Sequence, residues 1–212
     1  MKNDNELIIA IPKGFLHEGS YKYFSNLGIN FHSSDIEKNA SRELIYFDKK
    51  NNVKGLLVRP NDVNVYVEHG SADLGVVGLD LLKEQMPDVI KLKDLKFGKC
   101  KLVLAVKKES SYKKIKDLPA NCKIVTKFTR LANDFIQKKG LIAELIKLYG
   151  SVELGPLVGL SDGIIDLVAT GKTLKANNLI PIETILESNA VLIANPVSFK
   201  FKREKINRFL NI

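Results

Sequence analysis

The chain has 212 residues, of which 45% are hydrophobic and 27% charged, and this composition is ordinary for a globular protein. No apolar run approaches the roughly 20 residues that a membrane helix needs. The N-terminal stretch MKNDNELIIAIPKG is too polar for a secretory signal. We therefore expect a cytoplasmic protein that has no contact with a membrane.

The net charge is +9, from 33 basic and 24 acidic residues. Such an excess favours polyanionic partners: nucleic acid, acidic lipid or phosphorylated small molecules. The lysines are dispersed among acids and form no basic stripe interleaved with aromatic residues, which argues against nucleic acid. Cys100 and Cys122 form no CxxC pair, so we interpret them as buried thiols and expect no structural metal site.

Short apolar runs alternate with amphipathic segments, a pattern that predicts an α/β fold with buried parallel strands. Helices are expected around 21–28, from Asn61 or Asp62 to Gly70, and from 131 to Gly140, where glycine ends a helix. The expected strands are 7–11, 43–47, 54–59, 72–78, 101–106, 123–128, 144–149, 163–169 and 190–195.

The chain has no linker rich in Pro, Gly or Ser, and its softest joints are 91–99 and 170–179. A chain that leaves a first domain near 94 and returns near 176 would have a discontinuous lobe I, residues 1–93 and 177–212. Residues 94–176 would then form lobe II. Ligands favour the clefts between such lobes.

The stretch DLVATGKTLKANNL, residues 166–179, runs from a predicted strand into Thr-Gly-Lys-Thr. A Walker A loop needs a glycine five positions before Gly171, and Asp166 stands there instead. The main-chain N–H groups of a strand-to-helix turn can still hold an anion. Asp166 could accept hydrogen bonds from ribose hydroxyls beside a 5′-phosphate. The alternative is a glycine-containing turn in which Thr173 caps the helix.

Two further stretches carry candidate residues. In KLYGSVELGPLVGLSDGIIDLV (147–168), Ser151 can cap a short helix with Glu153 in its first turn, where a carboxylate is favoured. In LLVRPNDVNVYVEHGSADLGVVG (56–78), Arg59 ends a strand, and its guanidinium could donate two parallel hydrogen bonds to a phosphate. We interpret His69 as a helix C-cap and Asp73 as structural.

These stretches, with LKFGKCKLVLAV and AVLIANPVSFKFKREKI, resemble the ATP phosphoribosyltransferase family, in its catalytic subunit, from Ile8 to about Ile206. The resemblance implies a two-lobed, periplasmic-binding-protein-like (type II) α/β fold with the active site in the cleft. It also implies the first step of histidine biosynthesis. In that reaction N1 of the ATP adenine joins C1 of 5-phosphoribosyl diphosphate (PRPP), and pyrophosphate is released.

The resemblance also implies roles for individual residues. Arg42 and Arg59 would be catalytic. Lys101 stands where an arginine is usual and so lacks the bidentate fork. Lys127, at a strand end, is a weaker phosphate candidate, and each of these cations could instead be a surface residue. PRPP would bind Glu153, Asp166, Thr170, Gly171, Lys172, Thr173 and Leu174, and ATP would bind Lys13, Arg59, Lys101, Tyr149 and Gly150.

One departure concerns Phe15, in PKGFL, which stands where the family usually has an arginine that helps to bind the leaving pyrophosphate. Losing one charge-assisted phosphate contact costs about 1.5–3 kcal/mol. Phe15 would either stack on the adenine or be buried in its lobe.

The resemblance further implies a Mg²⁺ ion carried mainly by the PRPP diphosphate, because Mg²⁺ prefers phosphate oxygens and waters to an all-protein cage. The chain resembles the short form of the family, which works with a regulatory subunit similar to histidyl-tRNA synthetase. We therefore expect a homodimer within a hetero-oligomer. Two rival hypotheses are a non-catalytic receptor for a phosphorylated ligand and a nucleic-acid-binding regulator.

Overall fold

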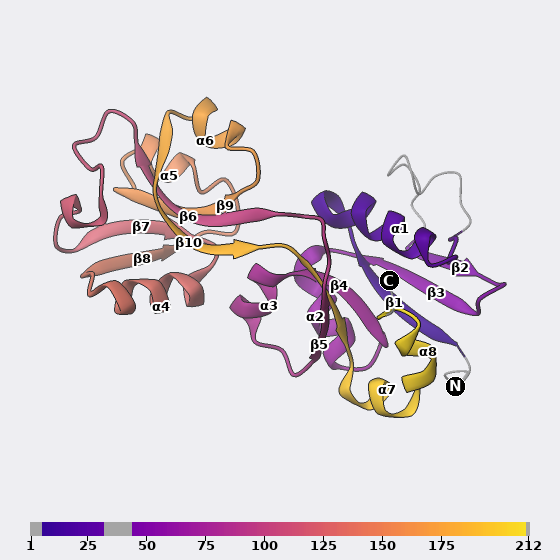
Figure 1. Ribbon diagram of the computed structural model, residues 1–212. Helices are drawn as coiled ribbons and strands as arrows, with labels where there is room; N and C mark the ends of the chain where they lie inside the picture. The colour runs from indigo at the N-terminus through magenta and orange to yellow at the C-terminus, as the bar shows by residue number, and fades with distance from the viewer. Residues whose placement is uncertain (1–5, 32–43, 211–212) are drawn as a thin grey trace. The chain divides into compact units, whose positions relative to one another are not determined.

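The computed structural model describes residues 6–31 and 44–210 (Figure 1). The chain forms two compact units. Unit 1 comprises Met1–Gly98 and Asn189–Ile212, and unit 2 comprises Lys99–Ser188. Each unit has its own mixed β-sheet with short helices.

The sheet of unit 1 has the strand order β2-β3-β1-β4-β11-β5. Strand β1 pairs in parallel with β3 and β4, whereas β2, β11 and β5 join the sheet through antiparallel pairs. The strands are β1 (Leu7–Pro12), β2 (Ile45–Asp48), β3 (Val53–Val58), β4 (Leu74–Gly78), β5 (Ile90–Asp94) and β11 (Ala190–Ala194).

Helices cover both faces of this sheet, which explains the continuous apolar run of β1. Leu7, Ile9 and Ile11 pack in a core with Phe24 of α1, and Ile8 and Ala10 pack in a second core on the opposite face, with α2. Alternate side chains of a strand point to opposite faces, so a strand buried on both reads as all apolar. The helices of unit 1 are η1 (Gly14–Leu16), α1 (His17–Asn26), η2 (Pro60–Asp62), α2 (Val63–Glu68), α3 (Leu79–Gln85), α7 (Pro196–Phe201) and α8 (Arg203–Asn207).

The sheet of unit 2 has the order β10-β6-β9-β7-β8. Strand β7 pairs in parallel with β8 and β9, and β6 pairs antiparallel with both β9 and β10. The strands are β6 (Cys100–Lys107), β7 (Cys122–Thr126), β8 (Ala143–Lys147), β9 (Gly163–Val168) and β10 (Leu179–Ser188), and the helices are η3 (Ile115–Asp117), α4 (Thr129–Lys139), α5 (Leu154–Leu157) and α6 (Lys172–Ala176).

Each strand expected from the sequence has a counterpart, but β5 and β10 were not predicted. Both lie at the edge of their sheet, and edge strands tolerate charges and proline. The sequence of β5 is IKLKD, and β10 contains Pro181 and two glutamates. Strand β10 therefore shows neither the apolar run nor the clean alternation by which strands are recognised. Strand β5 does alternate apolar and charged residues, but over only five positions, and this stretch was expected to form part of a joint.

The division between the units also differs from the sequence expectation. We expected crossings near 94 and 176, and the contacts divide the chain after Gly98 and after Ser188. The second difference has a clear cause, because β10 pairs with β6 from Leu179 to Ser188 and so stays with the sheet of unit 2. The expected helix from 131 to Gly140 is α4, and Gly140 follows it with a left-handed φ of 65°.

The packing of α2 on β4 leaves no room for a side chain at Gly75. A Cβ there would lie 2.7 Å from Val67 Cγ2 and 2.8 Å from Val63 Cγ1. We expect Gly75→Ala to lower the free energy of unfolding by about 1–3 kcal/mol, because overpacking forces α2 off the sheet. Denaturant unfolding measures the change. Gly150→Ala is the control, since its Cβ would meet nothing within 4 Å, and equal loss in both variants would contradict this packing.

Candidate functional site

The carboxyl ends of three parallel strands meet at one edge of the sheet in unit 2. Lys127 follows β7, Tyr149 lies two residues after β8, and the turn 169–171 follows β9. The N–H of Leu148 donates to the carbonyl of Thr126 over 3.0 Å, which holds the ends of β7 and β8 together. Ligands of open α/β sheets collect at this edge.

The turn between β9 and α6 is built around Gly171, whose φ of 75° lies in the left-handed region. Residues other than glycine enter this region at a cost. Leu174 is buried in the core of unit 2 and anchors α6, whereas Thr170, Lys172 and Thr173 are exposed. The first N–H groups of a helix have no partner within it, so those at the start of α6 lie among these polar side chains as potential donors.

The alternative in which Thr173 caps the helix is wrong. Gly171 occupies the N-cap position, Thr173 lies inside α6, and no side chain makes a capping hydrogen bond. The N–H of Lys172 donates to Thr170 Oγ1 over 3.5 Å, a long hydrogen bond that leaves the proton of this hydroxyl available. The hydroxyls of Thr170 and Thr173 therefore remain available to a ligand.

Asp166 lies inside β9, and its side chain is only 14% exposed. Lys127 Nζ lies 3.3 Å from Asp166 Oδ1. This ion pair does not have the geometry of a hydrogen bond, and Oδ1 is buried without any hydrogen-bond partner among the described residues. Buried polar atoms are usually paired, so the carboxylate has acceptor capacity that the fold leaves unused.

Glu153 occupies the N-cap position of α5, just before the first turn in which we expected it. The predicted side-chain cap by Ser151 is wrong: Ser151 has a left-handed φ of 48° and contributes only its carbonyl, which accepts from the N–H of Leu154. Tyr149 is 89% exposed, with Lys147 Nζ 5.3 Å from its ring centroid. Gly150 has neither a left-handed φ nor a close neighbour, so nothing in unit 2 requires glycine there.

Lys101, near the start of β6, pairs with Val168, the last residue of β9. Its ammonium makes an ion pair of 3.0 Å with Glu187, and both side chains are more than half exposed. Exposed pairs of this kind contribute little, about 0–1 kcal/mol. The ion pair joins Lys101 to β10, on the other side of β6 from β9, and breaking it would cost little.

Unit 1 brings two predicted cations to the carboxyl edge of its own parallel strands. Lys13 follows β1, Arg59 follows β3, and the N–H of Lys13 donates to the carbonyl of Val58 over 2.9 Å. Neither side chain has an ion-pair partner among residues 6–31 and 44–210. Two neighbouring cations without a counter-ion favour an anionic ligand. Arg42 lies outside the described residues.

Phe15, in the turn after β1, is 66% exposed. The expectation that it is buried in its lobe is therefore wrong. Gly14 precedes it with a φ of 75°, and no atom lies within 4 Å of where its Cβ would be. This left-handed residue directs the chain outward before α1 begins, which leaves the aromatic ring on the surface near Lys13.

Neither the two cysteines nor the buried His17 is among the candidate binding residues at the carboxyl edges of the two sheets. Cys122 is buried, and burial together with the charge of Asp162 raises the pKa of its thiol. Cys100 is partly exposed, so the prediction of two buried thiols is only half right. Burial lowers the pKa of His17 at the start of α1, which keeps this imidazole neutral at pH 7.

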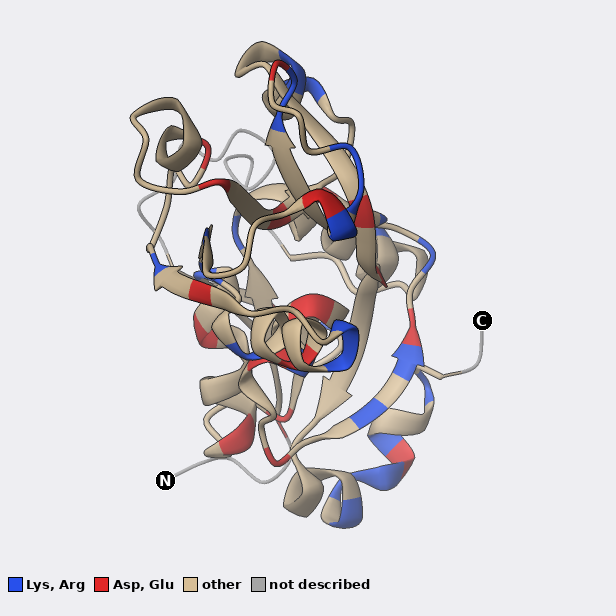
Figure 2. Ribbon diagram, turned by 90° about the vertical axis from the view of Figure 1, so that its left-hand side faces the viewer, with Lys and Arg blue, Asp and Glu red and all other residues tan. Residues whose placement is uncertain are grey.

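Figure 2 shows that Lys and Arg are spread along the ribbons of both units, with Asp and Glu between them. Among the described residues, no group of three or more His, Cys, Asp or Glu is arranged to hold a metal ion. In the same part of the chain, no helix is long and apolar enough to cross a membrane.

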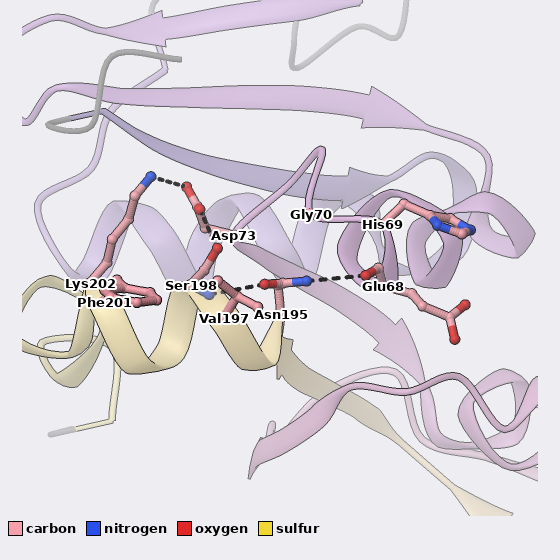
Figure 3. A pocket seen from close by; sticks show the side chains of 9 residues that line it. All are labelled: Glu68, His69, Gly70, Asp73, Asn195, Val197, Ser198, Phe201 and Lys202. Atoms are coloured by element: carbon pink, nitrogen blue, oxygen red, sulfur yellow. Dashed lines mark hydrogen bonds and ion pairs between the residues drawn. The ribbon is translucent and has the colours of Figure 1, made fainter. Parts of the chain in front are cut away.

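Figure 3 shows the residues that line a cavity of about 500 Å³ in unit 1. Asp73 of this cavity precedes β4, whereas Lys13 and Arg59 follow the parallel strands β1 and β3, so the cavity lies at the opposite end of the strands from these cations. Asp73, which precedes β4, accepts hydrogen bonds there from Ile8 N–H, Ser198 Oγ and Lys202 Nζ. Both carboxylate oxygens are thus paired, in agreement with the structural role predicted for Asp73.

The remaining polar residues of this cavity also bind one another. Asn195 Nδ2 donates to the carbonyls of Val67 and Glu68, and its Oδ1 accepts from Ser198 N–H. His69 is the C-cap residue of α2, as predicted. This network fastens α7 to the sheet, and it leaves no unused buried group to recognise a ligand.

Thr126 is a residue of the unit 2 edge that the sequence did not indicate. Its buried hydroxyl donates to the carbonyl of Ile165 over 2.7 Å and accepts from the N–H of Phe128 over 2.9 Å. The segment that carries Lys127 is thereby fixed to the residue before Asp166. A threonine at the end of an apolar run carries no sequence signal for such a role.

The fold is that of the two-unit α/β periplasmic-binding-protein-like class. A periplasmic sulfonate-binding protein from Methylobacillus flagellatus is similar over 96% of this chain and 65% of its own, with a TM-score of 0.62 and 18% identity. At 18% identity this similarity shows that the fold is shared and gives no information on function.

A narrower assignment follows from closer relatives. The ATP phosphoribosyl transferase (HisG:HisZ) complex from Thermotoga maritima contains a chain that is 35% identical, with a TM-score of 0.80 over 96% of this chain and 94% of that one. An ATP phosphoribosyltransferase from Thermosynechococcus vestitus is 45% identical over 204 residues, 96% of each chain. The family model HisG, ATP phosphoribosyltransferase, matches residues 59–212.

The chain belongs to the ATP phosphoribosyltransferase family. Its reaction is the transfer of a phosphoribosyl group to ATP, a pentosyltransferase step in histidine biosynthesis. The resemblance in the sequence is thereby confirmed. Membership of this family replaces the two rival hypotheses, a non-catalytic receptor and a nucleic-acid-binding regulator.

Proposed function

We propose that PRPP binds at the carboxyl edge of the sheet in unit 2, with its 5′-phosphate on the turn 169–171 and its ribose hydroxyls on Asp166. The observation that supports this most strongly is the buried Asp166 Oδ1, which accepts no hydrogen bond among the described residues. Ribose hydroxyls are donors of the kind this oxygen lacks. The remaining contacts come from Glu153, Thr170, Gly171, Lys172, Thr173 and Leu174.

The turn suits a phosphate for reasons of geometry and charge. Gly171 has no side chain and a left-handed φ of 75°, so the main chain can approach a ligand closely, and successive N–H groups in such a turn can form an anion-binding concavity. The exposed hydroxyls of Thr170 and Thr173 add donors, and the ammonium of Lys172 adds a positive charge. Leu174 holds the turn in place from the core.

The nucleotide is assigned to cations of unit 1. Lys13 and Arg59 take the phosphates of ATP, and the exposed ring of Phe15 offers a face for the adenine. Arg42 assists the leaving group together with Arg59. The resemblance adds Lys101, Tyr149 and Gly150 to the ATP contacts, and Lys101 can exchange Glu187 for a phosphate oxygen.

The chemistry needs positioning more than acid or base. The adenine N1 lone pair forms the bond to C1 of the ribose while the bond from C1 to the diphosphate oxygen breaks, and pyrophosphate leaves with that electron pair. No proton is removed from N1, because the nitrogen carries a free lone pair at neutral pH. The residues must therefore align two polyanions and offset the charge of the leaving group.

Mg²⁺ would neutralise negative charge on the diphosphate and so favour its departure. The donors at the turn are main-chain N–H groups, hydroxyls and an ammonium, a set that suits the anion and not a cation. This fits a Mg²⁺ ion that arrives on PRPP and keeps phosphate oxygens and waters as its ligands.

The chain works as a homodimer within a hetero-oligomer, with a regulatory subunit similar to histidyl-tRNA synthetase, in the cytoplasm. The similar chain from Thermotoga maritima was solved as a HisG:HisZ complex, which supports a second type of subunit here.

Isothermal titration of PRPP with Mg²⁺ tests the central contact. We expect Asp166→Asn to raise the dissociation constant of PRPP about ten- to hundredfold, because a hydrogen bond to a charged acceptor contributes about 1.5–3 kcal/mol. Asp162→Asn is the matched control, since Asp162 directly precedes β9 at its other end and its side chain accepts from the N–H of Lys123. Equal affinity of both variants for PRPP would contradict the assignment of Asp166 as the ribose contact.

A glycine pair tests the turn. Gly171 and Gly140 both have a left-handed φ, 75° and 65°, and a Cβ would meet nothing closer than 4.0 Å at either. Alanine should destabilise the protein by about 1–2 kcal/mol at each position. Only Gly171→Ala should also weaken PRPP binding, about tenfold or more, because it re-aims the N–H groups of the turn. A similar loss of affinity in Gly140→Ala would argue that strain alone is responsible.

A further inference from the structure

The pairing of Lys127 with Asp166 suggests a role that the family resemblance does not assign. We propose that Lys127 is the counter-ion that allows the carboxylate of Asp166 to serve a polyanionic sugar diphosphate. This inference rests on the proposed PRPP site and adds a positioning residue to it. Lys127 acts through Asp166, not as an independent phosphate contact.

The argument begins with an electrostatic conflict. PRPP carries several negative charges, and Asp166 adds another at the place where the ribose should bind. Like charges in a poorly solvated site repel each other strongly, because the effective dielectric there is well below that of water. A carboxylate that is only 14% exposed therefore needs a cation beside it before it can accept such a ligand.

Lys127 is the cation in position to do this. Its Nζ lies 3.3 Å from Asp166 Oδ1, yet it makes no hydrogen bond to that oxygen. The ammonium thus offsets the charge without using the acceptor site that the ribose hydroxyl requires. Its side chain is 42% exposed, so it can adjust as the ligand enters.

The main chain around Lys127 is held more firmly than an ordinary surface residue. On one side Thr126 is bonded to Ile165, the neighbour of Asp166, and on the other Phe128 is buried and bonded to Thr126. Lys127 Nζ also lies 5.2 Å from the ring centroid of Phe128, within the range of a cation–π contact. These contacts fix the base of the side chain and place its ammonium between Asp166 and the ring of Phe128.

A double-mutant cycle on PRPP binding tests the proposal. Calorimetric dissociation constants are measured for wild type, Lys127→Met, Asp166→Asn and the double variant. We expect Lys127→Met to raise the dissociation constant about tenfold or more when Asp166 is present, as for loss of an interaction with a charged group. In the Asp166→Asn background the same change should cost less than about threefold, because no buried charge remains to be offset.

Two controls accompany the cycle. Lys127→Arg keeps the positive charge beside Asp166, which is what the proposal requires, and should bind PRPP within about threefold of the wild type. Lys123→Met removes a lysine from the other end of β7, where it pairs loosely with Glu144 at 3.8 Å, and should leave PRPP affinity unchanged.

Three results would overturn the inference or what it rests on. An equal factor in both backgrounds would make Lys127 an independent phosphate contact. A Lys127→Met variant that binds as well as Lys123→Met would make it a surface lysine. If Asp166→Asn alone leaves PRPP binding unchanged, the proposed PRPP site itself is wrong, whatever Lys127 does.

Discussion

The parallel pairing of β7 with β9 is the constraint on which the candidate site depends. Its register places Thr126 opposite Ile165, so the first residue after β7 lies level with Asp166. Two chain segments about forty positions apart thereby supply a cation and a carboxylate to one edge of the sheet. The turn that follows β9 starts from the same edge, and a shift of this register by one residue would point Asp166 to the other face.

In this arrangement, different groups bind the phosphate and the hydroxyls of a phosphorylated sugar. Its phosphate is best held by main-chain N–H groups and hydroxyls, which adapt to the anion without a buried charge of their own. Its hydroxyls are best held by a carboxylate, which would repel the phosphates if it stood alone. Lys127 beside Asp166 makes the two tasks compatible, and Gly171 lets the turn reach the phosphate without steric cost.

The sequence predicted the elements that are buried on both faces, such as β1, because their runs are continuously apolar. It did not predict the edge strand β10, whose glutamates and Pro181 conceal the strand pattern. Asp166 and Gly171 could be found from their spacing, since both lie in one segment. The ion pair with Lys127 could not, because it depends on the register of two distant strands. Of the two expectations for Phe15, burial was wrong: aromatic side chains are more often buried, but this one is exposed and follows the left-handed Gly14.

The most direct test is a crystal structure of the protein with PRPP and Mg²⁺ bound. The account predicts the 5′-phosphate about 3 Å from the N–H groups that follow Gly171, a ribose hydroxyl that donates to the carboxylate of Asp166, and the ammonium of Lys127 still beside that carboxylate. A ligand that occupies another part of the chain, with Asp166 still lacking a donor, would contradict it.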